Sequence, residues 1–198
     1  MAFFNDLVRA IASVEGMEEM TVRGIGLNVR DEGHISKGGR GLSAARMTVR
    51  DAANLLIGVN GCVTAREAGS AVTYIRELRL SDRMGFREEA GKLFKAPDLM
   101  QTFGEYLESL IDMLRNEGSL EKGLLTESRD MPHGLVAIQI SFEKPDYGVD
   151  VKLSFESKSD DHVLLWFMGK SPGQRNDRKD VTSISAKSLK AVAQTLDS

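Results

Sequence analysis

The sequence predicts an α+β protein, because its apolar residues follow a helical period first and an alternating period later. Up to about residue 116, apolar side chains recur every three or four residues, as on the buried face of a helix. After Gly134 they recur at every second position, as on one face of a β-strand. We therefore expect a helical N-terminal part with one hairpin, then a three-stranded antiparallel meander with a C-terminal helix.

The helical expectation depends on spacing and on capping residues. Thr48 with Asp51, and Thr64 with Glu67, have the spacing of a capping box, in which two side chains satisfy free amides of the first turn. The expected helices are 5–15, 22–32, 48–60, 64–80 and 98–116, with another turn or two within 86–95 and a last helix from Ser185.

Three segments alternate apolar and polar residues, or are apolar throughout, as strands do. They are 136–142, 149–155 and 162–168, and Pro145 with Asp146 predicts a turn between the first two. The third segment is apolar on both faces, so we expect it to be the more covered strand. Residues 119–133 and 169–182 are polar and are expected to be loops.

A Gly-rich basic stretch, residues 34–47, separates two of the expected helices. Ile35 and Leu42 are its apolar shoulders, and residues 37–41 read Lys-Gly-Gly-Arg-Gly. Glycine allows the positive φ angles that tight turns require, so this composition predicts a short two-stranded hairpin with a basic tip.

Composition excludes several classes of protein. The chain has 198 residues, of which 41% are hydrophobic, enough for a core, and no run approaches the roughly 20 apolar residues of a membrane span. The first residues lack the order of a signal peptide, so we expect a cytoplasmic protein without membrane contact. A single cysteine, Cys62, and three scattered histidines exclude an internal disulfide and disfavour a metal site. No cofactor is expected, and no acid–base or nucleophile pattern predicts an enzyme.

The net charge of −3 conceals an uneven distribution. Residues 1–95 contain 14 Lys and Arg against 12 Asp and Glu, whereas residues 96–198 contain 12 against 17. Within the first half, residues 23–50 contain six basic and two acidic residues, a local net charge of +4. We expect two domains: 1–95 would bind DNA, and the acidic 96–198 would serve dimerisation or partner binding.

Helices followed by a Gly- and Arg-tipped hairpin resemble the winged helix-turn-helix family of DNA-binding regulators. The resemblance implies that the helix at 22–32 enters the major groove and that the hairpin contacts neighbouring phosphates. Two features depart from the family: Gly24 and Gly26 weaken the reading helix, and the wing follows the second helix rather than the third. The implied DNA-contacting residues are Arg23, Asn28, Arg30, Lys37, Arg40 and Arg46.

A second resemblance covers residues 38–58, which are similar to a segment of uncharacterised proteins from alphaproteobacterial phages and prophages. The shared residues include Gly39-Arg40-Gly41, Met47-Thr48 and the run from Asp51 to Ile57. It implies a phage-linked setting and no particular activity.

Our first hypothesis from the sequence is therefore a DNA-binding transcriptional regulator of phage origin that binds double-stranded DNA as a homodimer. The alternative is a non-enzymatic interaction protein that inhibits a host enzyme or defence complex through its acidic half. For either, the meander offers an exposed edge strand for dimerisation or for capture of a host protein partner.

Overall fold

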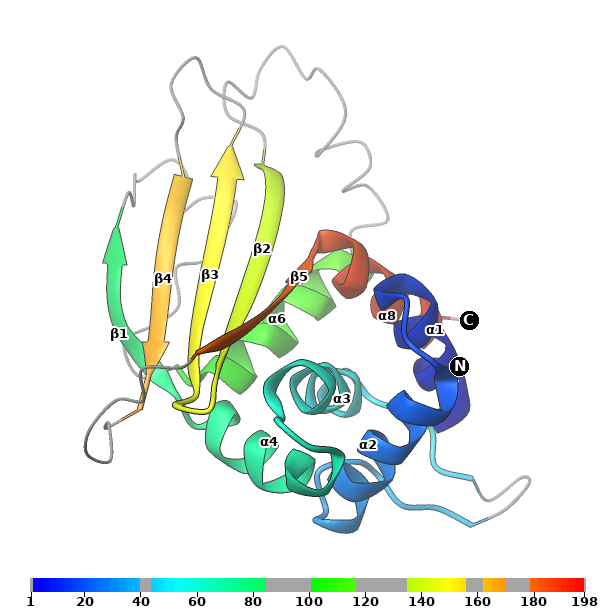
Figure 1. The fold of residues 1–198 in the computed structure, drawn as a ribbon. Coiled ribbons are helices and arrows are strands. Elements are labelled where there is room, and N and C mark those ends of the chain that lie inside the picture. The colour runs from blue at the N-terminus through cyan, green and yellow to red at the C-terminus, as the bar shows by residue number, and fades with distance from the viewer. Residues whose placement is uncertain are drawn as a thin grey trace.

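The chain folds as an α+β structure with helices packed against one face of an antiparallel sheet (Figure 1). The computed structural model describes residues 2–39, 44–84, 101–116, 135–155, 162–169 and 179–197. Its elements are α1 (Phe4–Glu15), α2 (Glu19–Asp31), α3 (Val49–Gly61), the 3₁₀ turn η2 (Ala65–Glu67), α4 (Ala68–Arg76), β1 (Arg79–Met84), α6 (Phe103–Asn116), β2 (Leu135–Lys144), β3 (Gly148–Phe155), β4 (His162–Met168), β5 (Asp180–Ser185) and α8 (Ala186–Asp197).

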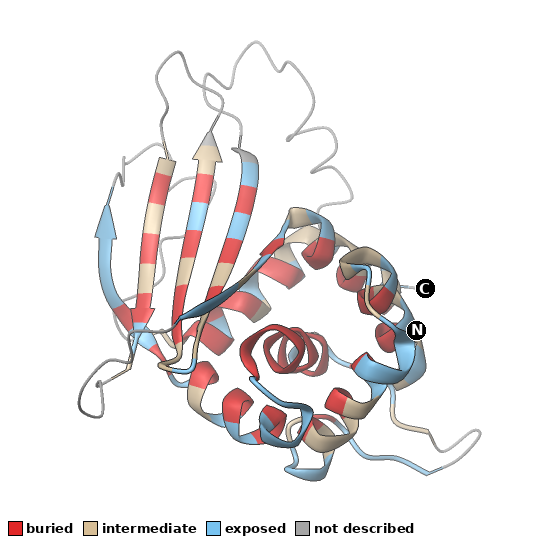
Figure 2. Cartoon of the chain, viewed as in Figure 1, coloured by how far each residue is buried: buried red, intermediate tan, exposed pale blue. Residues whose placement is uncertain are grey.

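Helix α3 lies at the centre of the molecule. Every residue from Asp51 to Gly61 is buried, and Figure 2 shows this part of the helix in red. Helices α2, α4, α6 and α8 and strands β2 and β5 all pack against it. Small and apolar residues make this possible, since Ala52, Ala53 and Gly58 let neighbouring helices approach closely. A helix expected to bury one side is therefore enclosed on every side.

The sheet has five antiparallel strands in the order β1-β4-β3-β2-β5. Alternate residues of β2, β3 and β4 are buried on the face toward the helices, as the striped strands of Figure 2 show. Phe103 of α6 packs edge-on against Phe142 and Phe167 of this face, with ring centroids 5.9 and 5.3 Å apart. Tyr106, one turn along α6, stacks on Phe167 at 5.6 Å.

The three predicted strands are present and pair in sequence order, but the predicted three-stranded sheet is two strands short. β1 occupies residues expected to end a helix, and β5 occupies part of an expected loop. Each has one buried residue, Leu80 in β1 and Ile184 in β5, because each lies at an edge of the sheet. A single buried residue leaves no alternating pattern to recognise.

The helix expected over 64–80 is shorter at both ends. Thr64 makes no side-chain cap, η2 replaces the first turn, and α4 ends at Arg76. The Thr48–Asp51 capping box is confirmed at the start of α3, with the Asp51 amide donating to Thr48 Oγ1 at 3.2 Å. The turn or two of helix expected within 86–95 lies outside the described residues.

The two-stranded hairpin predicted for residues 34–47 is wrong, because the residues that flank its tip form no strands. Residues 34–39 and 44–48 are described and form no strand. Their backbone groups bond elsewhere: the Ser36 amide donates to Asp51, and the Met47 amide donates to the Ala2 carbonyl. A ladder between the two flanks cannot form when these groups face α3 and the N-terminus instead.

The two halves of the chain share one hydrophobic core. β1, from the first half, pairs with β4, and α8, from the second half, packs on α1. The charge division near residue 95 therefore does not divide the core. Across the described ranges, no helix is both long and apolar enough to cross a membrane.

Two glycines provide a matched test of the close packing around α3. A Cβ on Gly58 would lie 2.7 Å from Cγ2 of the buried, β-branched Val29, whereas a Cβ on Gly24 would meet nothing within 4 Å. We expect Gly58→Ala to lower the free energy of unfolding by about 1–3 kcal/mol through overpacking. Gly24→Ala should raise it by up to about 1 kcal/mol through helix propensity. Urea unfolding measures both, and equal effects would contradict the packing account.

Candidate nucleic-acid interface

Helices α1 and α2 form a helical pair joined by a short turn. Gly16 ends α1 in the left-handed conformation, with φ of 67°, and α2 begins at Glu19. The helices pack against each other.

Two of the predicted arginines hold α2 to α1. Arg23 Nη1 donates to Asn5 Oδ1 at 3.0 Å and remains exposed. The Arg30 guanidinium lies 5.2 Å from the centroid of the Phe4 ring, a cation–π contact that leaves it partly buried. Arg23 is therefore accessible to a ligand, and Arg30 is accessible only in part.

Of the other four predicted residues, Asn28 bonds within α2. Lys37, Arg40 and Arg46 belong to residues 34–48, between α2 and α3. Asn28 Nδ2 donates to the Gly24 carbonyl of its own helix at 2.9 Å. Lys37 is exposed, and its Nζ donates to the Asp31 carbonyl at 3.3 Å. Arg46 is exposed, and Arg40 lies outside the described residues. The structure thus brings Arg23 and Arg30 together on α2 and places Lys37 and Arg46 on the loop that follows.

We call residues 34–48 the basic loop. It contains Lys37, Arg40 and Arg46 and no acidic residue. The exposed residues of α2 and its flanks are mixed in charge, because Glu18, Glu19, Asp31 and Glu32 are exposed with Arg23. Of the net charge of +4 in residues 23–50, the basic loop therefore carries three charges and Arg50 of α3 the fourth, whereas Arg23 and Arg30 of α2 are balanced by Asp31 and Glu32.

The carboxylate of Asp51 holds both ends of the basic loop. Ser36 donates through its amide to Oδ1 at 2.8 Å and through its hydroxyl to Oδ2 at 3.0 Å. Thr48 donates through its amide and its hydroxyl to Oδ2, at 2.8 and 2.9 Å. Asp51 is only 3% exposed, so these four donors replace the water that its charge has lost.

A second set of buried polar contacts connects the loop to α4 and α6. Asn54 Nδ2 donates to the His34 carbonyl, and Arg76 Nη1 donates to Asn54 Oδ1, both at 2.5 Å. Arg76 Nη2 in turn pairs with Glu108 Oε1 of α6 at 2.5 Å. Because Asn54 and Arg76 are buried, losing either contact would leave an unsatisfied polar group in the core.

The two sides of the basic loop come together close to its base. A Cβ on Gly38 would lie 2.1 Å from the Ala45 backbone nitrogen, so only glycine allows this approach. Ile35 and Met47, on either side, are buried. Figure 1 shows the described ends of the loop running outward from the helical part. Lys37 and Arg46 therefore lie exposed on segments whose base α3 fixes.

Sequence reasoning identified the cations but missed most of the residues that position them. The spacing of Thr48 and Asp51 predicted a cap, but nothing in the sequence indicated that Ser36, Asn54 or Arg76 would meet α3. In the described part of the chain, no three His, Cys, Asp or Glu residues gather as metal ligands. Burial raises the pKa of the Cys62 thiol, which disfavours the reactive thiolate.

No protein-family model, curated protein or solved structure matches the chain.

Asp51→Asn tests whether this carboxylate fixes the loop. An amide replaces one acceptor oxygen with a donor, which opposes the Ser36 or Thr48 donors, so we expect a loss of about 2–4 kcal/mol in unfolding free energy. Trypsin should also cut faster after Lys37, Arg40 or Arg46 in the folded protein. Asp6→Asn is the matched control, since Asp6 accepts from the Phe3 amide and from Arg9 Nη1 within the exposed first turns of α1. Equal loop cleavage in both variants would refute the anchoring role.

His34 makes the base of the loop sensitive to acid. Burial lowers its pKa from the ordinary 6.5, Arg76 and Arg50 lower it further, and Glu32 opposes them. A depressed pKa means that the unfolded chain binds the proton more readily, so stability present above pH 6.5 is lost as the pH falls. We expect the urea midpoint of the wild type to drop more than that of His34→Gln between about pH 7.5 and pH 5.5. His162→Gln on β4 controls for removing an imidazole, and parallel wild-type and His34→Gln curves would contradict the assignment.

Proposed function

We propose that the protein binds double-stranded DNA, with the basic loop as its main contact, and acts as a transcriptional regulator rather than as an enzyme. The observation that carries the proposal is the anchoring of both ends of the basic loop on Asp51. A fixed base allows Lys37 and Arg46 to meet phosphates without first losing the conformational freedom of a mobile loop. Glycine at 38 and 39 allows the backbone amides to approach phosphate oxygens as well.

Helix α2 supplies the second part of the proposed interface. Arg23 is exposed on the helix that follows the short turn, where helix-turn-helix proteins place base-contacting residues. Arg30 shares its side of the helix, seven residues on, and supports the position of α2 through Phe4. Asn28 contributes to base recognition only if DNA displaces its bond to the Gly24 carbonyl.

Binding as a homodimer would double the number of phosphate contacts, which is how regulators of this size commonly reach useful affinity. The resemblance of residues 38–58 to phage and prophage proteins suggests genes of phage origin as the regulated targets.

Removing two loop cations should weaken DNA binding and its dependence on salt. We expect Lys37→Ala with Arg40→Ala to reduce affinity for a duplex from the protein's own promoter region. The slope of log affinity against log salt should fall in magnitude by about 1–2, because each lost phosphate contact contributes about 0.9. Fluorescence anisotropy between about 50 and 200 mM salt measures both quantities.

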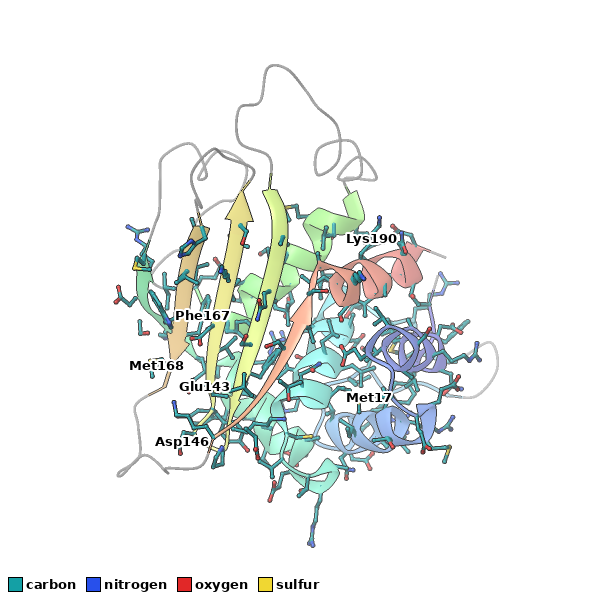
Figure 3. The ribbon with its side chains drawn as sticks, turned by 45° about the horizontal axis from the view of Figure 1, so that its top comes forward. Met17, Glu143, Asp146, Phe167, Met168 and Lys190 are labelled. Carbon is teal, nitrogen blue, oxygen red and sulfur yellow. The ribbon has the colours of Figure 1, made fainter. Side chains whose placement is uncertain are left out.

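A second double variant that loses the same charge distinguishes direct contact of the basic loop with DNA from general electrostatic attraction of the protein to DNA. Lys152→Ala with Lys190→Ala also removes two positive charges, from β3 and α8, away from the basic loop (Figure 3 labels Lys190). It should leave the salt slope near that of the wild type. Absence of binding at low salt, or the same loss in both double variants, would overturn the proposal.

A further inference from the structure

β5 is an edge strand with one free side. It pairs with β2 along Gln139–Lys144, and no other described strand pairs with it. Val181 is 57% exposed, and Ser183 and Ser185 are also exposed. The backbone amides and carbonyls on its outer side therefore provide a template for another strand.

A groove of about 820 Å³ follows this free side of β5. Four consecutive residues of β5, 182–185, line one wall, and the ends of α1 and α3 line the opposite wall. Residues 137–139 and Lys144 of β2, with Lys187 and Ser188 of α8, complete the lining. Successive strand residues point to opposite faces, so a wall made of consecutive residues is the edge of the strand. Figure 3 shows Met17, from the turn after α1, on the helical side of β5.

The wall opposite β5 contains a carboxylate that lacks a cation. Asn60 Nδ2 donates to the two oxygens of Glu15 at 3.3 and 3.2 Å, and the Ser188 side chain also bonds to it. Of the residues described, none forms an ion pair with Glu15. Burial raises the pKa of Glu15, as expected for a carboxylate with only neutral partners.

The groove that holds this carboxylate has both apolar and charged side chains in its lining. Two lysines line it, Lys144, whose Nζ donates to Thr182 Oγ1 at 2.7 Å, and Lys187, and neither forms an ion pair with Glu15. Val14 and Met17 flank Glu15 along the chain, and Val59 and Ile184 line the groove beside it. A ligand that fits must therefore combine an extended backbone for β5, an apolar side chain for this surface and a cation for Glu15.

We propose that this groove binds an extended peptide segment of a partner protein, which adds a strand to β5 and places a Lys or Arg side chain against Glu15. Backbone bonds to β5 would supply affinity, and the cation would supply sequence preference. A second copy of β5 is a poor occupant, because Asp180–Ser185 contains no Lys or Arg to meet Glu15. This site is separate from the basic loop and does not depend on DNA binding.

A displayed library of random decapeptides, selected on the purified full-length chain, tests the proposal. We expect enrichment of alternating apolar residues with Lys or Arg at one position. For a synthetic selected peptide, replacing that cation with Gln should weaken binding about tenfold, as one charged contact does. When the protein carries Glu15→Gln, replacing the peptide's cation with Gln should change the affinity little, because the charged partner of that cation is already absent.

Backbone methylation distinguishes strand addition from other modes of binding. In an added strand, amides on alternate residues face β5, so N-methylation at one set of alternate positions should abolish binding to the wild type. N-methylation at the other set should change it much less. This readout uses the wild-type protein and therefore does not depend on how well a variant folds.

Two matched variants separate the possible outcomes. Glu19→Gln, at the exposed start of α2, should keep the preference for a cation. Lys37→Ala with Arg40→Ala should bind the peptide normally, so failure of DNA binding and failure of peptide binding remain distinguishable. An unenriched library, a cation preference that persists in Glu15→Gln, or equal tolerance of both methylation patterns would overturn the proposal.

Discussion

The structure depends on the burial of α3 from Asp51 to Gly61. A helix of thirteen residues surrounded by four helices and two strands must satisfy two conditions: small side chains where neighbours approach, and a partner for every buried polar group. Gly58 meets the first condition against Val29. Asp51 and Asn54 meet the second by bonding to the loop that precedes the helix. The fold and the position of the basic loop therefore have a common origin.

The same polar contacts connect parts of the chain that are distant in sequence. From the loop base at His34, Asn54 leads to Arg76 on α4 and then to Glu108 on α6. A buried arginine between two acceptors is costly to disturb, because each broken contact leaves a charge or a dipole without water. The loop is thus held by the core itself. The proposed DNA contact uses the exposed cations on this base, whereas the proposed peptide site is the groove beside β5.

Some helices and strands could be predicted from the sequence, and others could not. The helical period placed α1, α3 and α6, and the alternating period placed β2, β3 and β4, because each buries a regular set of side chains. β1 and β5 escaped prediction because an edge strand with one buried residue has no period. Residues 34–47 were predicted to be a hairpin from their glycines. Glycine permits a turn, but the flanks bond to Asp51 and Ala2 instead of to each other.

The sequence alone determined the α+β class, the capping of α3 by Thr48 and Asp51, and the surplus of positive charge in residues 23–50. These properties follow from local spacing and composition, so no distant contact is needed to recognise them. Only the tertiary structure decided that the Arg30 guanidinium lies over the Phe4 ring, that Asp51 also accepts from Ser36, and that Glu15 accepts from Asn60. Those contacts join residues up to 45 positions apart, and their partners are chosen by packing around α3, which no local pattern encodes.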